Sequence, residues 1–252
     1  MPDRIPAQVP AAIRADLVCA YHVLDLDGQG SGLGGHVTAR VPGTETFLCH
    51  GFGLAFDDVG PDDLLHVNFA LELLAGCGKV NPTLTFHSAI YRARPDVRCI
   101  VHTHADHVVA LTATGTRFEL VTQLAAMLHE DWALLDEYDG VILHSSAGET
   151  LARELGPRRA LILKNHGLIS VGASSGEAVI GAVVMEACAR VQLDAMRGGT
   201  VSPLPPASAA ATKRFLTTDA QTLDRWNMLK RRAHRARPDR IPASLVADCR
   251  PT

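Results

Sequence analysis

The chain has 252 residues, 47% of them hydrophobic and 20% charged, a balance typical of a globular protein with enough apolar material for a sizeable core. Its formal net charge of −3 gives no electrostatic reason to expect nucleic acid or a membrane surface as a partner. No stretch approaches the roughly 18 consecutive apolar residues that a membrane-spanning helix needs. The amino-terminal segment also lacks an apolar signal core, and the six cysteines lack C-x-x-C spacing, so we expect reduced, buried cysteines in a soluble cytoplasmic protein.

The first half of the chain alternates between helix and strand signals. Apolar residues at helical spacing predict a helix over residues 11–26. The glycine-rich residues 28–35 predict a loop, and the strand-like alternation that follows argues against a dinucleotide-binding motif there. The further elements expected in this half are strands at 36–41, around 47–49 and 66–74, a helix at 86–94, a buried strand at 98–104 and a helix at 107–113.

Two S-x-x-E capping boxes, at residues 146–149 and 174–177, mark helix starts in the second half. They predict one helix that ends near residue 155 and a longer one that ends near residue 196. Between them, residues 160–172 predict two strands, or one bent strand, around a His-Gly turn. The elements together predict an α/β domain with a central, mostly antiparallel sheet and flanking helices.

The composition changes after residue 200. Residues 201–211 are rich in Pro, Ala and Ser and predict a linker, and residues 213–235 predict one more helix with a basic end. A nucleic-acid patch is one interpretation of that end, but in an acidic chain a solvated helix terminus favoured by the helix dipole explains it better. We therefore expect one domain over residues 1–200 and a linker with a helical extension over residues 201–252.

Three histidines that follow apolar strands give the strongest chemical signal. His102 and His104 are two residues apart at the end of a buried strand, so their side chains share a face and can meet one ion. Two desolvated imidazoles are costly when protonated and unsatisfied when neutral, and a shared metal ion removes both costs. His166 follows a second apolar strand, and Gly167 after it allows a sharp turn. The sequence thus predicts one divalent ion per subunit (Zn, Mn or Fe(II)) in an open, catalytic type of site.

The motifs around these histidines resemble the class II aldolase/adducin family. The matching stretches are HSAIYRARPDV at 87–97, VHTH at 101–104 and LKNHGL at 163–168, and the resemblance extends from about residue 10 to 196. It implies a three-layer α/β/α fold around a mainly antiparallel, nine-stranded sheet, commonly in homotetramers with active sites at subunit interfaces. It also implies that the three histidines match the family's three histidine metal ligands.

The sequence departs from the sugar-phosphate aldolases of that family at an acidic position. Those enzymes carry an acidic residue four positions before the histidine that matches His87, and it serves as acid and base. Here that position is Thr83. Its hydroxyl is not a general base near neutral pH without a partner, so the usual aldol mechanism lacks its base.

The stretches that match the family's phosphate-binding loops also differ. They offer His36, Arg40 and His50 in place of small hydroxyl residues, so a phosphorylated sugar is not the expected substrate. Arg40 could instead form a bidentate pair with a carboxylate, with the two imidazoles beside it and Phe52 and Phe56 as an apolar wall. The alternative for Arg40 is a surface salt bridge, and for His50 a structural role.

These features predict a divalent-metal-dependent lyase that decarboxylates, or cleaves by retro-aldol reaction, a small, non-phosphorylated carboxylate or hydroxy-carbonyl substrate. The candidate catalytic residues are Thr83, Gln123 and His129, although a helix without a catalytic role also explains the last two. One alternative is a non-haem iron oxygenase that cleaves an aromatic 2-oxo or 2-hydroxy acid, because the ion would have only neutral ligands. The other is a non-catalytic, adducin-like scaffold, which predicts broken metal ligands, whereas all three are intact.

Overall fold

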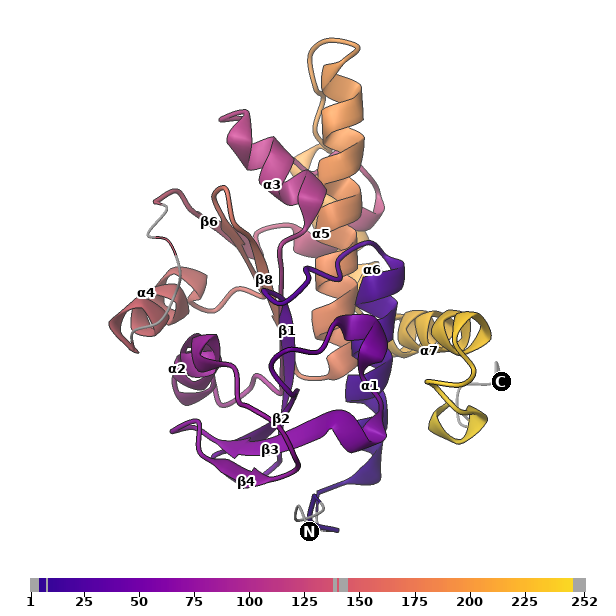
Figure 1. Ribbon diagram of the computed structural model, residues 1–252. Helices are drawn as coiled ribbons and strands as arrows, with labels where there is room; N and C mark the ends of the chain where they lie inside the picture. Colours follow the sequence, from indigo (N-terminus) through magenta and orange to yellow (C-terminus); the bar gives the residue numbers. More distant parts are fainter. Residues whose placement is uncertain (1–4, 8, 138–139, 141–144, 247–252) are drawn as a thin grey trace.

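The computed structural model describes residues 5–7, 9–137, 140 and 145–246, and its centre is a sheet (Figure 1). The strands are β1 (His36–Arg40), β2 (Thr46–His50), β3 (Leu64–Asn68), β4 (Leu73–Ala75), β5 (Cys99–Thr103), β6 (Trp132–Leu135), β7 (Ala160–Leu163) and β8 (Gly167–Gly172). They form one eight-stranded sheet in the order β4-β3-β2-β1-β5-β8-β7-β6. All neighbouring pairs are antiparallel except β6 and β7, which confirms the mainly antiparallel sheet, with eight strands rather than nine in the described residues.

Helices cover both faces of this sheet and give three layers. The helices α1 (Ala11–Leu26), α3 (Asp106–Ala113) and α5 (Ser175–Met196) lie on one side, and α2 (Thr85–Ala93) and α4 (Ser145–Leu155) on the other (Figure 1). Successive side chains of a strand point to opposite faces of the sheet, so Val101 packs into the buried cluster beside α1 and α5, and Ile100 packs into the cluster beside α2 and α4. A sheet buried on both faces explains the continuous apolar run of β5 and confirms the α/β/α architecture.

Most expected elements are confirmed. Helix α1 has the expected bounds, and its residues at positions 17, 21 and 24 are buried at helical spacing. The second capping box begins α5, where the Ser174 side chain accepts a hydrogen bond from the Glu177 amide. Residues 66–74, expected as one strand, instead hold a turn between β3 and β4, in which Leu71 has a φ of 64°. The described cysteines are buried as expected except Cys77, which is exposed.

The C-terminal region forms two helices, α6 (Pro206–Leu216) and α7 (Asp219–Ala236). The expected linker is wrong from residue 206 onward, because proline is tolerated in the first helical turn and the alanine-rich segment that follows favours helix. The single helix expected over 213–235 is broken before Thr218, whose side chain caps α7. Helix α7 packs against α1 and α5, with Trp226 buried on Gly176. The division into 1–200 and 201–252 stays a prediction. None of the helices in the described ranges is long and apolar enough to cross a membrane.

Candidate metal centre

Strand β5 and the turn between β7 and β8 bring three histidines together at one end of the central strands of the sheet. His102 lies inside β5, His104 follows its end, and His166 lies in the β7–β8 turn. Because β5 and β8 are adjacent and antiparallel, the end of β5 meets the start of β8. Gly167 has a φ of 151°, and a Cβ there would collide with the carbonyl oxygen of Thr103, so this close approach requires glycine.

The three imidazoles face one another. One nitrogen of each lies within 4.8 Å of the other two, and the Nε2 atoms of His104 and His166 are 3.1 Å apart. His102 Nδ1 lies 2.9 Å from the carbonyl oxygen of Leu168, and since a carbonyl can only accept, Nδ1 carries the hydrogen. In a neutral ring this leaves the lone pair on Nε2, the nitrogen that a metal would use.

All three imidazoles are held in the neutral state. Burial and the neighbouring histidines lower the pKa of His102 well below its ordinary value. Burial, together with His104, lowers the pKa of His166 to about 4, and burial lowers the pKa of His104 as well. Three neutral imidazoles with one nitrogen of each within 4.8 Å of the other two are a donor set that fits a divalent metal ion. Among the described residues this group contains histidines only and no carboxylate.

A buried chain of hydrogen bonds runs beside the cluster. His36 lies opposite His102 in the β1–β5 pair, and their ring centroids are 4.9 Å apart. We define the His36 network as six side chains in contact order. They are Tyr91, Thr38 (2.8 Å from Tyr91), His87 (2.8 Å from Thr38), His36 (2.8 Å from His87), Thr83 (2.9 Å from His36) and Asn81 (2.7 Å from Thr83). Burial and the neighbouring imidazoles lower the pKa values of His36 and His87 well below normal, so both rings are neutral.

Of the predicted polar residues, the structure places His36 against His102 of the cluster, and Thr83 is hydrogen-bonded to His36. Arg40 lies away from the cluster, and His50 is close enough to influence the pKa of His36 but has its own contacts elsewhere. Arg40 is at the far end of β1, roughly 13 Å along the strand from His36. Its guanidinium lies over the rings of Phe69 and Tyr91, at 5.2 and 5.4 Å from their centroids. These ring contacts and a 3.4 Å hydrogen bond to the carbonyl oxygen of Arg94 hold the side chain, and Arg40 forms no salt bridge within the part of the chain that the structure describes.

His50 belongs to the buried cluster on the α1 side of the sheet. Its Nδ1 lies 3.0 Å from the Tyr21 hydroxyl, and its ring makes an edge contact with Phe56. Burial lowers the pKa of His50 to about 4. Phe56 is fully buried in the same cluster, and Phe52 is exposed on a loop, so these two rings do not form a shared wall.

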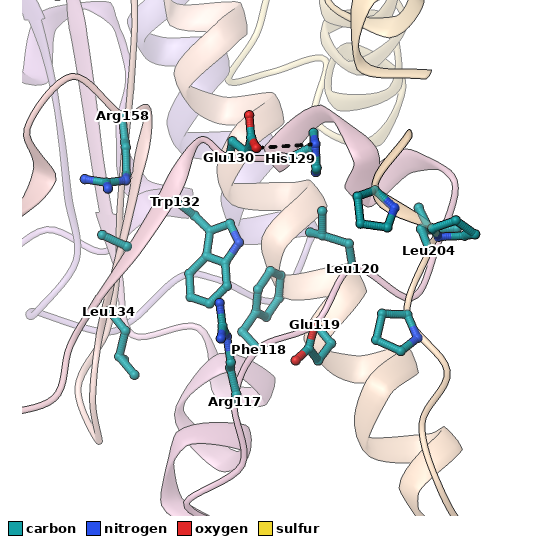
Figure 2. A pocket seen from close by; sticks show the side chains of 14 residues that line it. Arg117, Phe118, Glu119, Leu120, His129, Glu130, Trp132, Leu134, Arg158 and Leu204 are labelled. Carbon is teal, nitrogen blue, oxygen red and sulfur yellow. Dashed lines mark ion pairs between the residues drawn. The ribbon is translucent and has the colours of Figure 1, made fainter. Parts of the chain in front are cut away.

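Gln123 and His129 lie near the other end of the sheet. Strand β6 runs parallel to β7, so the histidine turn follows the end of β7 whereas residue 129 precedes the start of β6. Gln123 is exposed, and His129 lines a separate cavity of about 930 Å³ between β6, residues 117–120 and residues 203–206. Figure 2 shows His129 beside Glu130 on this cavity, with Arg117 under the ring of Trp132.

The His36 network, with its members His87 and Tyr91, was not predicted from the sequence. Their signal was present: residues 36 and 38 share a strand face, and residues 87 and 91 share a helix face. Which strand face meets which helix face could not be read from either pattern alone.

The comparisons with known proteins agree with this architecture. Residues 15–193 match the family described as the Class II Aldolase and Adducin N-terminal domain. The chain is 31% identical over 202 residues to 4-hydroxy-3-prenylphenylpyruvate oxygenase/4-hydroxy-3-prenylbenzoate synthase of Streptomyces roseochromogenus subsp. oscitans (79% of this chain, 73% of the relative). It is equally similar to decarboxylase NovR of Streptomyces niveus, at 31% over 202 residues (79% and 75%). The structure of L-fuculose 1-phosphate aldolase from Glaciozyma antarctica PI12 is similar with a TM-score of 0.82 and 29% identity, over 91% of both chains.

Proposed function

Because the chain belongs to the class II aldolase and adducin family, we propose that it is a divalent-metal-dependent lyase acting on a small, non-phosphorylated carboxylate or hydroxy-carbonyl substrate. The observation that carries the proposal is the convergence of three neutral imidazoles, from His102, His104 and His166, at one end of the central strands. A divalent ion held there would supply Lewis-acid chemistry toward an oxygen of the substrate.

The surrounding residues support a carboxylate rather than a phosphate as the bound group. Arg40, the cation that the sequence offered, is stacked on Phe69 and Tyr91. His36, beside the cluster, and Thr83, bonded to it, are both neutral, so no cationic side chain among these residues would contact the further oxygens of a phosphate. A single carboxylate could be bound by the ion with neutral hydrogen-bonding groups around it.

The neutral residue at position 83 favours decarboxylation over retro-aldol cleavage. Retro-aldol cleavage requires a base that removes a hydroxyl proton, and a threonine hydroxyl does not do this near neutral pH. Loss of CO₂ leaves the electron pair on the substrate and requires no proton removal. The similarity to decarboxylase NovR supports the same choice.

A non-haem iron oxygenase is the second candidate. Two observations favour it: the cluster, as far as the structure describes the chain, contains no carboxylate, and one relative is named as an oxygenase. Three-histidine iron sites are less common than sites with two histidines and one carboxylate, so this candidate ranks below the lyase.

We also propose a homotetramer with active sites at subunit interfaces, in which Gln123 and His129 would belong to the site of another copy. Both residues lie near the end of the sheet opposite to the histidine cluster of their own chain. If they act in catalysis, they must therefore do so at the cluster of another copy.

Metal analysis of protein purified without added ions tests the proposal. We expect about one Zn or Mn per chain, and anaerobic CO₂ release from a member of a panel of small 2-oxo and ortho-hydroxy carboxylic acids. The variant His102→Ala should lose the ion and the activity, whereas His234→Ala, on α7, should keep both. Bound iron with O₂ uptake would support the oxygenase instead. An absent metal, with His102→Ala as active as the unchanged protein, would refute both.

A further inference from the structure

The hydrogen bonds of the His36 network can run in only one direction, and Asn81 fixes it. The Asn81 side chain accepts a hydrogen bond from the backbone N–H of Thr83 at 3.0 Å, so the atom that faces Thr83 is the amide oxygen. The Thr83 hydroxyl lies 2.7 Å from the same oxygen. Because an amide oxygen only accepts, the single hydroxyl hydrogen of Thr83 is donated to Asn81.

This direction propagates through the network. Thr83 has no further hydrogen, so it accepts from Nε2–H of His36 at 2.9 Å. His36 is fully buried among imidazoles and neutral, so its Nδ1 is an acceptor for Nε2–H of His87 at 2.8 Å. Nδ1 of His87 then accepts from the Thr38 hydroxyl at 2.8 Å. Tyr91 in turn donates to Thr38, whose hydroxyl and carbonyl oxygens lie within 3.1 Å of it.

Thr83 is the point where this network meets solvent. The other five members are at most 3% exposed, whereas Thr83 is half-buried. Its oxygen has given its hydrogen to Asn81 and accepts one from His36, so one lone pair remains and no hydrogen. A substrate carboxylate or carbonyl oxygen facing it would place acceptor against acceptor, which leaves a polar group unpaired.

We propose that Asn81 makes Thr83 a hydrogen-bond acceptor only, and that the centre thereby selects substrates that present a hydroxyl hydrogen there: hydroxy acids over their 2-oxo counterparts. The inference rests on the proposed function for the presence of a small carboxylate at this centre. It assigns Asn81 as a positioning residue, which acts on the substrate through Thr83.

The tautomers provide the first test, in metal-free protein with ¹⁵N-labelled histidine. The ring ¹⁵N shifts should show Nε2–H on His36 and His87, and Nδ1–H on His102. Asn81→Asp should keep this pattern because a carboxylate oxygen accepts both hydrogen bonds, and Asn81→Leu should lose it at His36. A hydrogen on Nδ1 of His36 or His87 in the unchanged protein, or an imidazolium at either, would overturn the proposal even if Asn81→Leu does not fold.

Selectivity provides the second test, by calorimetric titration of Mn²⁺-loaded protein with L-lactate and with pyruvate. The ratio of the two Kd values should shift about tenfold toward pyruvate in Thr83→Val, as expected for loss of one hydrogen bond, and stay unchanged in Thr83→Ser. An unchanged ratio in Thr83→Val, or binding of neither acid, would overturn the selectivity with the metal proposal intact. Failure to bind Mn²⁺ at all would overturn both.

Discussion

Protonation of His50 should destabilise the fold, and the structure gives the size of the effect. The Tyr21 hydroxyl donates to the carbonyl oxygen of Val37, at 2.5 Å, so its oxygen accepts from the backbone N–H and from Nδ1–H of His50. Burial lowers the pKa of His50 from 6.5 to about 4, and the residue is 3% exposed, so solvent screens the charge little.

The sign and magnitude follow from proton binding. The folded state holds the His50 pKa below its unfolded value, so the unfolded state binds more protons between about pH 6.5 and 4. The stabilisation is therefore complete above pH 6.5 and is lost as the pH falls. A difference of about 2.5 pKa units corresponds to about 3 kcal/mol in full, of which about 2 kcal/mol is lost between pH 7 and pH 5.

The assay is urea unfolding of metal-free protein at pH 7, 6 and 5, for the unchanged chain, His50→Gln and the control His234→Gln. His50→Gln should be less stable at pH 7 through its lost contacts, but its free energy of unfolding should fall by about 2 kcal/mol less than that of the other two on going to pH 5. Equal pH dependence of all three proteins would refute the reasoning. A role of His50 in substrate binding predicts instead a change in KM without this pH signature.

Three further predictions concern the framework and the assembly. Gly167→Ala should lower the free energy of unfolding in urea by more than about 3 kcal/mol, because the new Cβ would collide with the Thr103 carbonyl oxygen. The control Gly28→Ala, at a φ of 82° with open space around it, should lower it by about 1 kcal/mol. Equal losses in the two variants would contradict the argument from the turn. The carboxylate of Glu186 accepts hydrogen bonds from the backbone N–H groups of His107 and Val108, at 3.0 and 3.1 Å, three and four residues after His104. Glu186→Gln should therefore lower the free energy of unfolding by about 2 kcal/mol and weaken metal binding, measured by competition with a chelator. Unaltered metal affinity would show that the two features are independent. If sites form between subunits, co-expression of inactive His102→Ala and His129→Ala chains should restore activity, because random mixing gives about a quarter of the sites both intact residues. No recovery of activity would exclude a site shared in this way.

The sequence predicted the features that depend on local pattern. A continuous apolar run predicted β5, and the two-residue spacing predicted that His102 and His104 share a face at its end. Helical spacing predicted α1, and a capping box predicted the start of α5. The third ligand followed because an apolar strand before a His-Gly pair indicates a tight turn. Each of these signals is contained within a short stretch of sequence, so each element can be predicted without knowing its tertiary contacts.

The features that the sequence did not predict depend on contacts between distant segments. The alternation of β1 predicts that His36 and Arg40 share a face, but it does not predict that Arg40 stacks on Phe69, which lies in the turn between β3 and β4. The N-P-T segment indicates a turn, but it does not show that the Thr83 hydroxyl accepts a hydrogen bond from His36, which lies 47 positions away in the sequence. Helix α6 begins in the segment whose Pro- and Ala-rich composition predicted a linker, because composition alone does not distinguish a proline in the first helical turn from one in a loop.

The absence of a carboxylate from the described cluster also determines the charge of the proposed centre. Three neutral imidazoles leave a bound divalent ion with its full charge of +2, whereas an acidic residue at position 83 would reduce it to +1. In a partly buried site with a low effective dielectric, each unit of charge changes the attraction for an anion by an amount on the order of several kcal/mol. The neutral Thr83 therefore favours binding of a carboxylate monoanion to the ion itself and removes the need for an arginine beside it. Under the proposed function, an anionic substrate would therefore not need Arg40, which packs on Phe69 and Tyr91.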